Sequence, residues 1–432
     1  MSLASLFPVP RLQQLAWLAW GVALFLLPFN KFGGVRNAAL LILLVTLLSL
    51  WRLAPPVRRP GYSPGLVLGG LIVLWALLVS GLGPYPAESL RAVSKDLLGQ
   101  MLLVAAAWRL VRSETDVRRS LLIALAGFAA VSFLSLGEIV NSGFETLFSA
   151  NIEDAPRRHN AFWGGYAASA SVYLPLLVGI AVLLPMRTWL RAGVIALILF
   201  VLVLTALYGS RSAVLIVALT AVVGFLLARR YRTLLVLMAL LAALLIGLYS
   251  QADLGYLNKY KSLADPQTYV TNQGLSSRLA VWQGAAEVIA ERPWLGYGYG
   301  WKKLAWVINE GGFASRWQAE APDLARFYLQ EAGAASYGRV NPHNYVLQVV
   351  FELGLIGFAL VVAFWGVVVG ACVRLIRHQP PDLNRWGGVL LLTLVGYFLS
   401  NVNNGYWVGG VANLAVAIAG MALALRDESA KS

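Results

Sequence analysis

Apolar runs of about 18 residues or more recur along this 432-residue chain, and each is long enough to cross a lipid bilayer. Only 12% of the residues are charged and 59% are hydrophobic, whereas a soluble domain carries about 25% charged residues. The sequence therefore predicts an all-α integral membrane protein that crosses the bilayer many times.

Twelve membrane spans are predicted from these runs. Their limits are residues 15–29, 36–53, 64–82, 95–111, 119–140, 161–184, 189–208, 211–229, 232–250, 344–376, 386–403 and 406–425. The tenth is 33 residues long, although about 20 suffice for one crossing. Its first turns are expected to project beyond the bilayer, with a break near Gly354 or Gly357.

The positive charges are distributed unevenly between the two predicted sides. With the N-terminus in the cytoplasm, the cytoplasmic segments hold 18 Lys and Arg residues and the short outer loops hold 7. Lys and Arg are enriched in cytoplasmic loops, so both termini are predicted to be cytoplasmic. The net charge of +14 does not indicate a nucleic-acid partner, because the basic residues are scattered in small groups between apolar segments.

One long outer loop, residues 251–342, separates the ninth and tenth spans. Within it, "SSRLAVWQGAAEVIAERP" predicts a helix with a Ser cap and a Pro stop, and residues 323–335 are also helix-like. Between them, "GYGYG" lacks the Lys-Ser/Thr of a phosphate loop and is interpreted as a tight turn. The expected parts are therefore spans in 1–250, a loop subdomain in 251–342, and spans with a short cytoplasmic tail in 343–432.

One of the three histidines, His343, directly precedes the tenth predicted span. Asn341 is expected to cap this helix and Pro342 to occupy its first position, which places His343 in the first turn. The helix dipole disfavours a charged imidazole there, so a neutral His343 is suited to act as a general base. The alternative is an interfacial histidine that makes only local hydrogen bonds.

Several cations are predicted on the outer side. Arg211 opens the eighth span after a very short turn, and Arg278 lies at the start of the loop helix. A guanidinium matches the geometry of phosphate oxygens, so both are candidate phosphate ligands. Snorkelling to lipid headgroups and a solvated helix face are the alternatives. Lys31, Arg36 and Arg91 are further candidates for substrate binding, with an interface anchor as the alternative role.

No cofactor is predicted. The sequence contains no D-x-D, no H-E-x-x-H and no Cys/His cluster, so no metal site stands out. It also contains no nucleotide-binding fingerprint. The energy for any reaction on the outer side is expected to come with the substrate.

Three stretches together resemble a known family. In order and spacing, "GSRSA", "SSRLAVWQGAAEVIAERPWLGYGYG" and "NPHNYVLQVVFELGLIGF" are similar to the shared region of the bacterial O-antigen ligase and O-antigen polymerase family. The most specific pattern is H-N, then an apolar helix, then E-x-G-x-x-G, which here is His343, Asn344, Glu352, Gly354 and Gly357. The resemblance covers roughly residues 205–357.

This resemblance implies a fold similar to the GT-C class and glycosyl transfer at the periplasmic face of the bacterial inner membrane. The implied donor is an O-antigen polysaccharide on undecaprenyl pyrophosphate. A single dominant loop is typical of the ligases, whose acceptor is the lipid A–core oligosaccharide of lipopolysaccharide. Polymerases, which extend lipid-linked repeat units and often have two substantial loops, are the alternative. Protein-glycosylating members usually carry a larger C-terminal domain than the few residues that follow the last predicted span.

The resemblance also suggests roles for individual residues. Arg211 and Arg278 would hold the pyrophosphate and stabilise the developing negative charge, without a metal. His343 would take the proton of the acceptor hydroxyl in one inverting displacement, with Asn344 beside it as a substrate contact. Glu352, about 13 Å further along the helix axis, is expected to have a structural role. Both lipid tails would enter sideways from the membrane lipids. A transporter of lipid-linked sugar is a further alternative, although the charges avoid the span centres.

Overall fold

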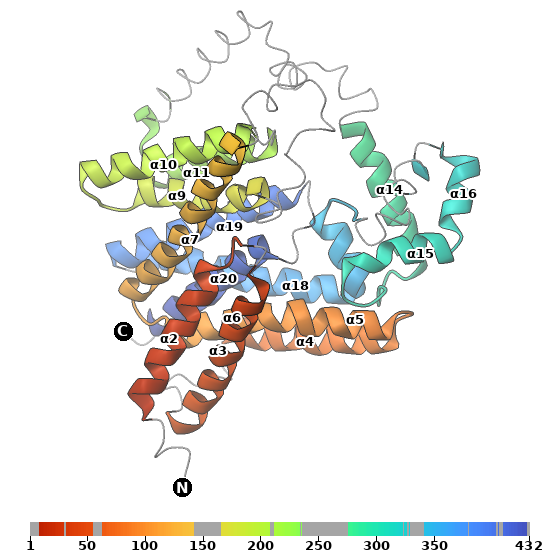
Figure 1. Cartoon of the computed structure of the whole chain (residues 1–432), viewed down its shortest axis with the longest axis horizontal. Coiled ribbons are helices and arrows are strands. Elements are labelled where there is room, and N and C mark those ends of the chain that lie inside the picture. Colours follow the sequence, from red (N-terminus) through yellow and green to blue (C-terminus); the bar gives the residue numbers. More distant parts are fainter. Residues whose placement is uncertain are drawn as a thin grey trace, which may run out of the picture.

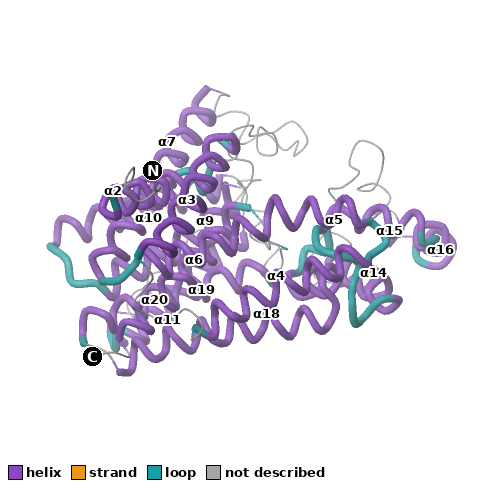
Figure 2. Tube along the Cα trace, turned by 90° about the horizontal axis from the view of Figure 1, so that it is seen from below, coloured by secondary structure: helices purple, strands orange, loops and turns teal. Residues whose placement is uncertain are grey.

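The structure is a computed structural model. It describes residues 8–29, 32–54, 63–141, 166–207, 211–233, 235, 275–322, 324–325, 328, 341–378, 380–402, 405 and 409–429. In these ranges the chain is helical and contains no strand. Most helices form one bundle, and a smaller group lies at one end of its long axis (Figure 1). Figure 2 shows this smaller group, α14 to α16, at the end away from the C-terminus.

The N-terminal part of the bundle consists of α2 (Val9–Phe25), α3 (Gly33–Leu53), α4 (Pro64–Leu82), α5 (Pro86–Ala92), η2 (Val93–Leu97), α6 (Leu98–Leu110) and α7 (Glu114–Asn141). Helix α2 packs against α3 and α7. The π-helical turn η2 joins α5 directly to α6. Residues 86–110 are therefore continuously helical.

The second part of the bundle consists of α9 (Tyr166–Leu183), α10 (Thr188–Leu207), α11 (Arg211–Leu227), α18 (Tyr345–His378), α19 (Pro381–Asn401) and α20 (Gly410–Ser429). Helix α9 packs against α11 and α19, and α18 packs against α4 and α19. Segments far apart in the sequence thus share one core.

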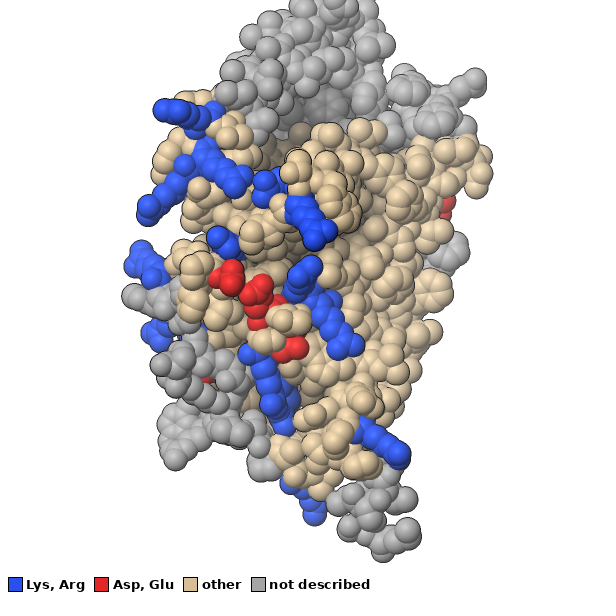
Figure 3. Space-filling view, turned by 90° about the vertical axis from the view of Figure 1, so that its left-hand side faces the viewer, with Lys and Arg blue, Asp and Glu red and all other residues tan. Residues whose placement is uncertain are grey.

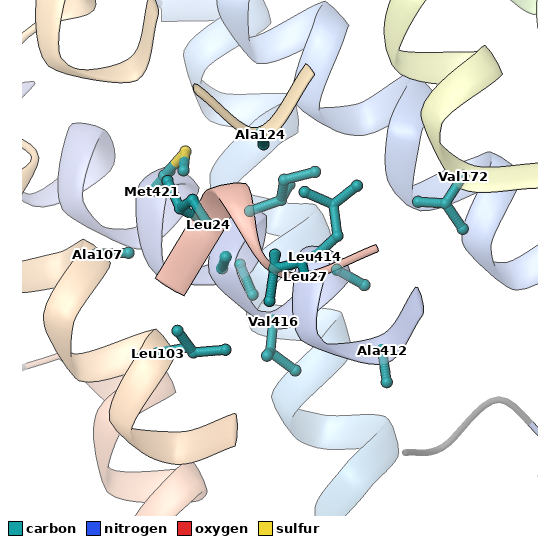
Figure 4. Close-up of a cluster of buried hydrophobic side chains, with 14 of the residues drawn as sticks. Leu24, Leu27, Leu103, Ala107, Ala124, Val172, Ala412, Leu414, Val416 and Met421 are labelled. Carbon is teal, nitrogen blue, oxygen red and sulfur yellow. The ribbon is translucent and has the colours of Figure 1, made fainter. Parts of the chain in front are cut away.

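Helix α20 is enclosed by the other helices. All of its residues from 411 to 425 are buried except Asn413, which is half-buried. Figure 4 shows apolar side chains of this core, including Leu24, Leu27, Leu103, Ala107, Leu414, Val416 and Met421. A Cβ at Gly420 would lie 2.5 Å from the carbonyl oxygen of Val104 on α6. Because small residues let helix backbones approach closely in lipid, Gly420 permits this tight packing.

The prediction of a membrane protein is confirmed. Within the described residues, six helices are long and apolar enough to cross a bilayer: Gly33–Leu53, Pro64–Leu82, Glu114–Asn141, Tyr166–Leu183, Thr188–Thr205 and Tyr345–Arg377. Eleven of the twelve expected spans coincide with observed helices. The other, residues 232–250, lies almost entirely outside the described residues. The number of twelve spans and the likeness to the GT-C class stay predictions.

Helix α18 is broken where the sequence indicated. Gly354 has φ 67° and ψ −179°, which lie outside the helical region. A Cβ there would overlap the carbonyl oxygen of Trp294. Glycine alone adopts such a backbone conformation at low cost, so the expected break is confirmed at Gly354.

The smaller group of helices is formed by α14 (Leu275–Glu291), η5 (Trp301–Lys303), α15 (Leu304–Glu310) and α16 (Phe313–Glu320). A separate apolar cluster holds it together, and Phe351 of α18 belongs to that cluster. The Pro stop of α14 is confirmed, but its Ser cap is wrong, because the helix already begins at Leu275. Helices α15 and α16 were not expected, and the helix-like stretch 323–335 lies mostly outside the described residues.

The end of the bundle opposite α14–α16 is rich in Lys and Arg, with few acidic residues between them (Figure 3). Arg109, Arg112 and Arg119 line one hollow among these helix ends. A second hollow is lined by Arg191, Arg230 and Arg385. The six arginines come from segments that the sequence placed on a single side of the membrane, so the fold gathers them at the same end.

Candidate active site

His343 occupies a strained turn directly before α18. Its φ is +47°, in a region that few residues other than glycine adopt. Its backbone N–H donates a hydrogen bond of 2.7 Å to Oδ1 of Asn341, which is the Asx turn that Asn side chains favour. Backbone strain of this kind persists where the surroundings hold it and is concentrated at functional sites. His343 is therefore the first candidate for chemistry.

The predicted start of the helix is wrong by a few residues. The cap is Asn344, whose Oδ1 accepts the N–H of Leu347 at 3.1 Å and whose carbonyl accepts the N–H of Gln348 at 3.0 Å. Helix α18 begins at Tyr345, so His343 precedes the first turn. Asn341 is used by the Asx turn instead, because Asn caps helices and stabilises turns by similar hydrogen bonds.

Asn344 also connects two helices. Its Nδ2 donates to the carbonyl of Val402 at 3.2 Å, directly after the end of α19. The N-terminal end of α18, with its free N–H groups and positive dipole, is thereby held beside the C-terminal end of α19 at Val402. His343 lies next to this end of the helix.

The break in α18 is filled by residues 293–300. The N–H of Leu355 donates to the carbonyl of Pro293 at 2.8 Å, and the N–H of Tyr297 donates to the carbonyl of Phe351 at 2.8 Å. The indole Nε1 of Trp75 donates to the carbonyl of Leu353 at 2.9 Å. Irregular backbone at membrane depth is tolerated only where protein or water satisfies it, and here the protein does.

The "GYGYG" stretch is consequently not the tight turn that was expected. Gly296, Gly298 and Gly300 all have positive φ, and the stretch runs along α18. A Cβ on Gly296 would lie 2.6 Å from the backbone nitrogen of Gly354. The glycines are needed because two backbones come into contact at this point.

A carboxylate and an ammonium are buried on either side of Gly300. Glu352 is fully buried, and its carboxylate accepts the N–H of Gly300 at 2.7 Å and Nε2 of Gln348 at 2.9 Å. Lys303 is also fully buried, and its Nζ donates to the carbonyls of Tyr299 and Gly300 at 2.5 and 2.7 Å. The bond from Gly300 ties the 299–303 segment to α18, which is the structural role expected for Glu352. The bonds from Lys303 hold the backbone of the segment itself.

Electrostatics couple the same two side chains. Burial lowers the pKa of the Lys303 ammonium to about 8, against the opposing attraction of Glu352 and Glu88. Removing one member of such a buried pair leaves the other charge without compensation, which is strongly destabilising. The packing of residues 299–303 against α18 is therefore expected to depend on the charges of Lys303 and Glu352.

A small polar pocket, with a cavity volume of about 40 Å³, lies beside this pair. It is lined by Arg36 and Asn37 of α3, Lys95 and Asp96 of η2, Gln100 of α6 and Asn413 of α20, among others. Asp96 interacts electrostatically with Arg36, Lys95 and Lys302, and also with Glu352. π-Helical turns such as η2 occur frequently at functional sites. Cations and amides around one carboxylate can bind small polar or anionic groups.

The structure places the predicted site residues as follows. Arg36 lines this pocket, and Arg91 is exposed in the last turn of α5. Arg211 is the first residue of α11, and Arg278 lies in the first turn of α14. The side chains of both lie outside the described part, as does Lys31. The structure thus brings Arg36 together with Lys95 and Asp96 and does not test whether Arg211 or Arg278 approaches His343.

Sequence reasoning missed Lys303, Lys95 and Asp96. One signal pointed to Lys303: an acidic residue inside an apolar helix, Glu352, requires a partner. Nothing local identified Lys303, because the segment around Gly300 is 52 residues away from Glu352 in the sequence. Among the described residues, no group of three His, Cys, Asp or Glu side chains could hold a metal ion.

Comparison with known proteins supports the resemblance seen in the motifs. Residues 193–362 match the family described as O-antigen ligase, a range that includes His343, the break at Gly354 and the buried pair. Over 430 residues the chain is 23% identical to the O-antigen ligase of Salmonella typhimurium (strain LT2), which covers 94% of this chain and 95% of that protein. This membrane protein thus matches the O-antigen ligase family over residues 193–362 and is similar to an O-antigen ligase over most of its length.

Proposed function

We propose that this protein is an O-antigen ligase of lipopolysaccharide biosynthesis. It transfers O-antigen polysaccharide from undecaprenyl pyrophosphate to the lipid A–core oligosaccharide. The observation that carries the proposal is the similarity to a protein named O-antigen ligase over 94% of this chain and 95% of that protein. The strained turn at His343 lies within the part that matches the family.

The proposed setting is the bacterial inner membrane, with twelve spans in a GT-C-like fold. Residues 1–250 hold nine spans, residues 251–342 form a periplasmic loop subdomain, and residues 343–432 hold three spans and a cytoplasmic tail. The basic end of the bundle supports cytoplasmic termini, because Lys and Arg are enriched on that side. It lies opposite α14–α16 (Figures 1 and 3), so His343 would face the periplasm.

In the proposed reaction, His343 acts as the general base. It takes the proton from an acceptor sugar hydroxyl while that oxygen attacks the anomeric carbon of the donor. The bond between this carbon and the pyrophosphate oxygen breaks, undecaprenyl pyrophosphate leaves, and the configuration inverts. The position of His343 at the positive end of α18 favours its neutral form, which is the form that accepts a proton.

The leaving group needs charge stabilisation, and arginines supply it. Arg211 and Arg278 would hold the pyrophosphate, since a guanidinium binds two phosphate oxygens at once. Arg36 and Lys95 line the polar pocket and are suited to hold sugar hydroxyls or phosphates of one substrate. Lys31 and Arg91 would guide anionic headgroups toward it. Charge stabilisation of this kind needs no metal.

The test uses purified full-length protein in detergent with a chelator present. Lipid-linked glycan and lipid A–core are supplied, and the products are separated on gels. His343→Ala should reduce transfer by about 10²–10⁴-fold, the usual contribution of a general base. The matched control is His378→Ala at the other end of the same helix, which should leave transfer within about twofold, as expected for a residue away from the site.

Other outcomes of the same assay identify the alternatives. If the wild-type protein lengthens the lipid-linked glycan and ignores lipid A–core, it is a polymerase. If it forms no bond with either acceptor but moves the donor across a bilayer, it is a transporter. Equal activity of His343→Ala and wild type would remove His343 from the mechanism.

A further inference from the structure

A second pocket lies at the basic end of the bundle, away from the candidate active site. It has a cavity volume of about 340 Å³ and is formed where α9, α10, α11, α18 and α19 end or begin. Three guanidinium groups line it, those of Arg191, Arg230 and Arg385, together with the amide of Asn384. The other lining residues are mostly apolar: Val182, Leu183, Leu184, Pro185, Leu227, Ala228, Ile376 and Gly388. The pocket therefore has a cationic side and an otherwise apolar wall.

Arg191 has unused hydrogen-bonding capacity in this pocket. Its Nη2 donates to the carbonyl of Leu184 at 3.3 Å, at the end of α9. Its Nε is buried and has no hydrogen-bond partner among the described residues. A buried donor without an acceptor is costly, and a bound anion would satisfy it.

Arg230 is held in place by a strained turn. Arg229 has φ 55°, at a position after a helix where glycine is the usual residue. The N–H of Arg230 donates to the carbonyl of Phe225 at 2.9 Å and closes the end of α11. Because a left-handed conformation costs a non-glycine residue about 1–2 kcal/mol, the strained turn that fixes Arg230 is retained at a cost in stability.

Exposed aromatic residues lie next to the pocket arginines in the sequence. Trp189 and Tyr231, neighbours in the chain of Arg191 and Arg230, have 66% and 54% of their surface exposed. Exposed Trp and Tyr are enriched at the membrane–water interface. The charge is only partly balanced, since Asp382 pairs with Arg385 at 3.2 Å and both are exposed.

We propose that this pocket binds an anionic phospholipid. Its phosphate is held by Arg191, Arg230 and Arg385, and its acyl chains lie against the apolar wall and the exposed Leu226 of α11. Basic pockets between transmembrane helices bind anionic headgroups by this combination, and guanidinium groups match phosphate oxygens. The bound lipid would join the ends of α9, α11 and α19, which pack together in the bundle.

The experiment measures lipid retention by the full-length protein. Protein is purified from membranes with equal phosphatidylglycerol and phosphatidylcholine, and bound lipid is counted by native mass spectrometry. The wild type should retain phosphatidylglycerol selectively. Arg191→Gln/Arg230→Gln/Arg385→Gln should lower its retention at least about tenfold, because each guanidinium near an anionic lipid adds appreciable affinity.

The control removes three other exposed arginines, Arg11, Arg52 and Arg118, from α2, α3 and α7. This variant loses the same charge and should retain the lipid as the wild type does. The proposal is overturned if the control loses as much lipid as the pocket variant, because the face as a whole would then attract the lipid.

A second measurement covers the case in which the triple variant does not fold. Added phosphatidylglycerol should raise the thermal unfolding midpoint of the wild type, and should raise it less for the single variant Arg385→Gln, whose side chain is already exposed. An equal rise in both proteins contradicts the proposal. So does an equal rise with inorganic phosphate alone, which would make the pocket a simple anion site.

Discussion

The two halves of α18 differ in the hydrogen bonds they make and in the side chains they expose. In residues 345–353, Gln348 and Glu352 are buried among polar partners, and the backbone makes hydrogen bonds to residues distant in the sequence. In residues 355–378, the helix is regular and mostly apolar, and exposed side chains such as Ile356 and Val362 suit contact with lipid. The difference shows that a membrane helix can be interrupted where other protein segments replace the hydrogen bonds it loses.

The largest contrast between the halves is expected from two glycine substitutions. Gly354→Ala places a Cβ at φ 67° against the carbonyl of Trp294, so it should cost about 4 kcal/mol or more through strain and overpacking. Gly366→Ala has no neighbouring atom within 4 Å and should be neutral or stabilising by about 1 kcal/mol. Chemical or thermal unfolding in detergent measures both. If both substitutions lowered the free energy of unfolding equally, the break at Gly354 would not require glycine.

The next contrast concerns the buried charge. Lys303→Met leaves Glu352 without its cationic partner and should lower the free energy of unfolding by about 3 kcal/mol at pH 7. The charge-matched control is Lys302→Met, since Lys302 is exposed, and it should change stability by less than about 0.5 kcal/mol. If both variants are equally stable, the buried pair does not secure the 299–303 segment.

The same lysine makes a pH-dependent prediction. Burial lowers the pKa of Lys303 from 10.5 to about 8, so between these values the unfolded chain binds more protons at this residue than the folded chain. Stability rises with pH wherever the unfolded state binds more protons. From pH 8 to pH 10 the wild type should therefore gain stability relative to Lys303→Met. A difference that stays constant or shrinks would show that Lys303 is not held in this environment.

The smallest of these effects is expected at Trp75. Trp75→Phe removes the hydrogen bond to the carbonyl of Leu353 and leaves that carbonyl without this donor at the break, at a cost of about 1–2 kcal/mol. Trp51→Phe on the exposed face of α3 is the control and should change little. Equal midpoints of unfolding for the two variants would indicate that other groups satisfy the break.

Much of the bundle could be predicted because hydropathy is a property of short segments. Long apolar runs gave helices close to their expected limits. Helices α15 and α16 were missed because they are only 7 and 8 residues long and their apolar residues pack into a local cluster. The start of α18 was misplaced because Asn341 and Asn344 are both good caps, and only the folded turn shows that Asn341 binds the N–H of His343.

The amino-acid order was sufficient to predict a membrane protein, the interruption at Gly354, the grouping of basic residues on one side and the motif around His343 that resembles the O-antigen ligase family. Each of these depends on residues close together in the chain, where helix length, glycine geometry and charge act locally. The tertiary structure was needed to show that Lys303 and Glu352 are buried on either side of Gly300, that residues 293–300 fill the break and that α20 is enclosed. These are contacts between distant segments, and packing of the whole bundle selects them because a buried polar group without a partner is costly.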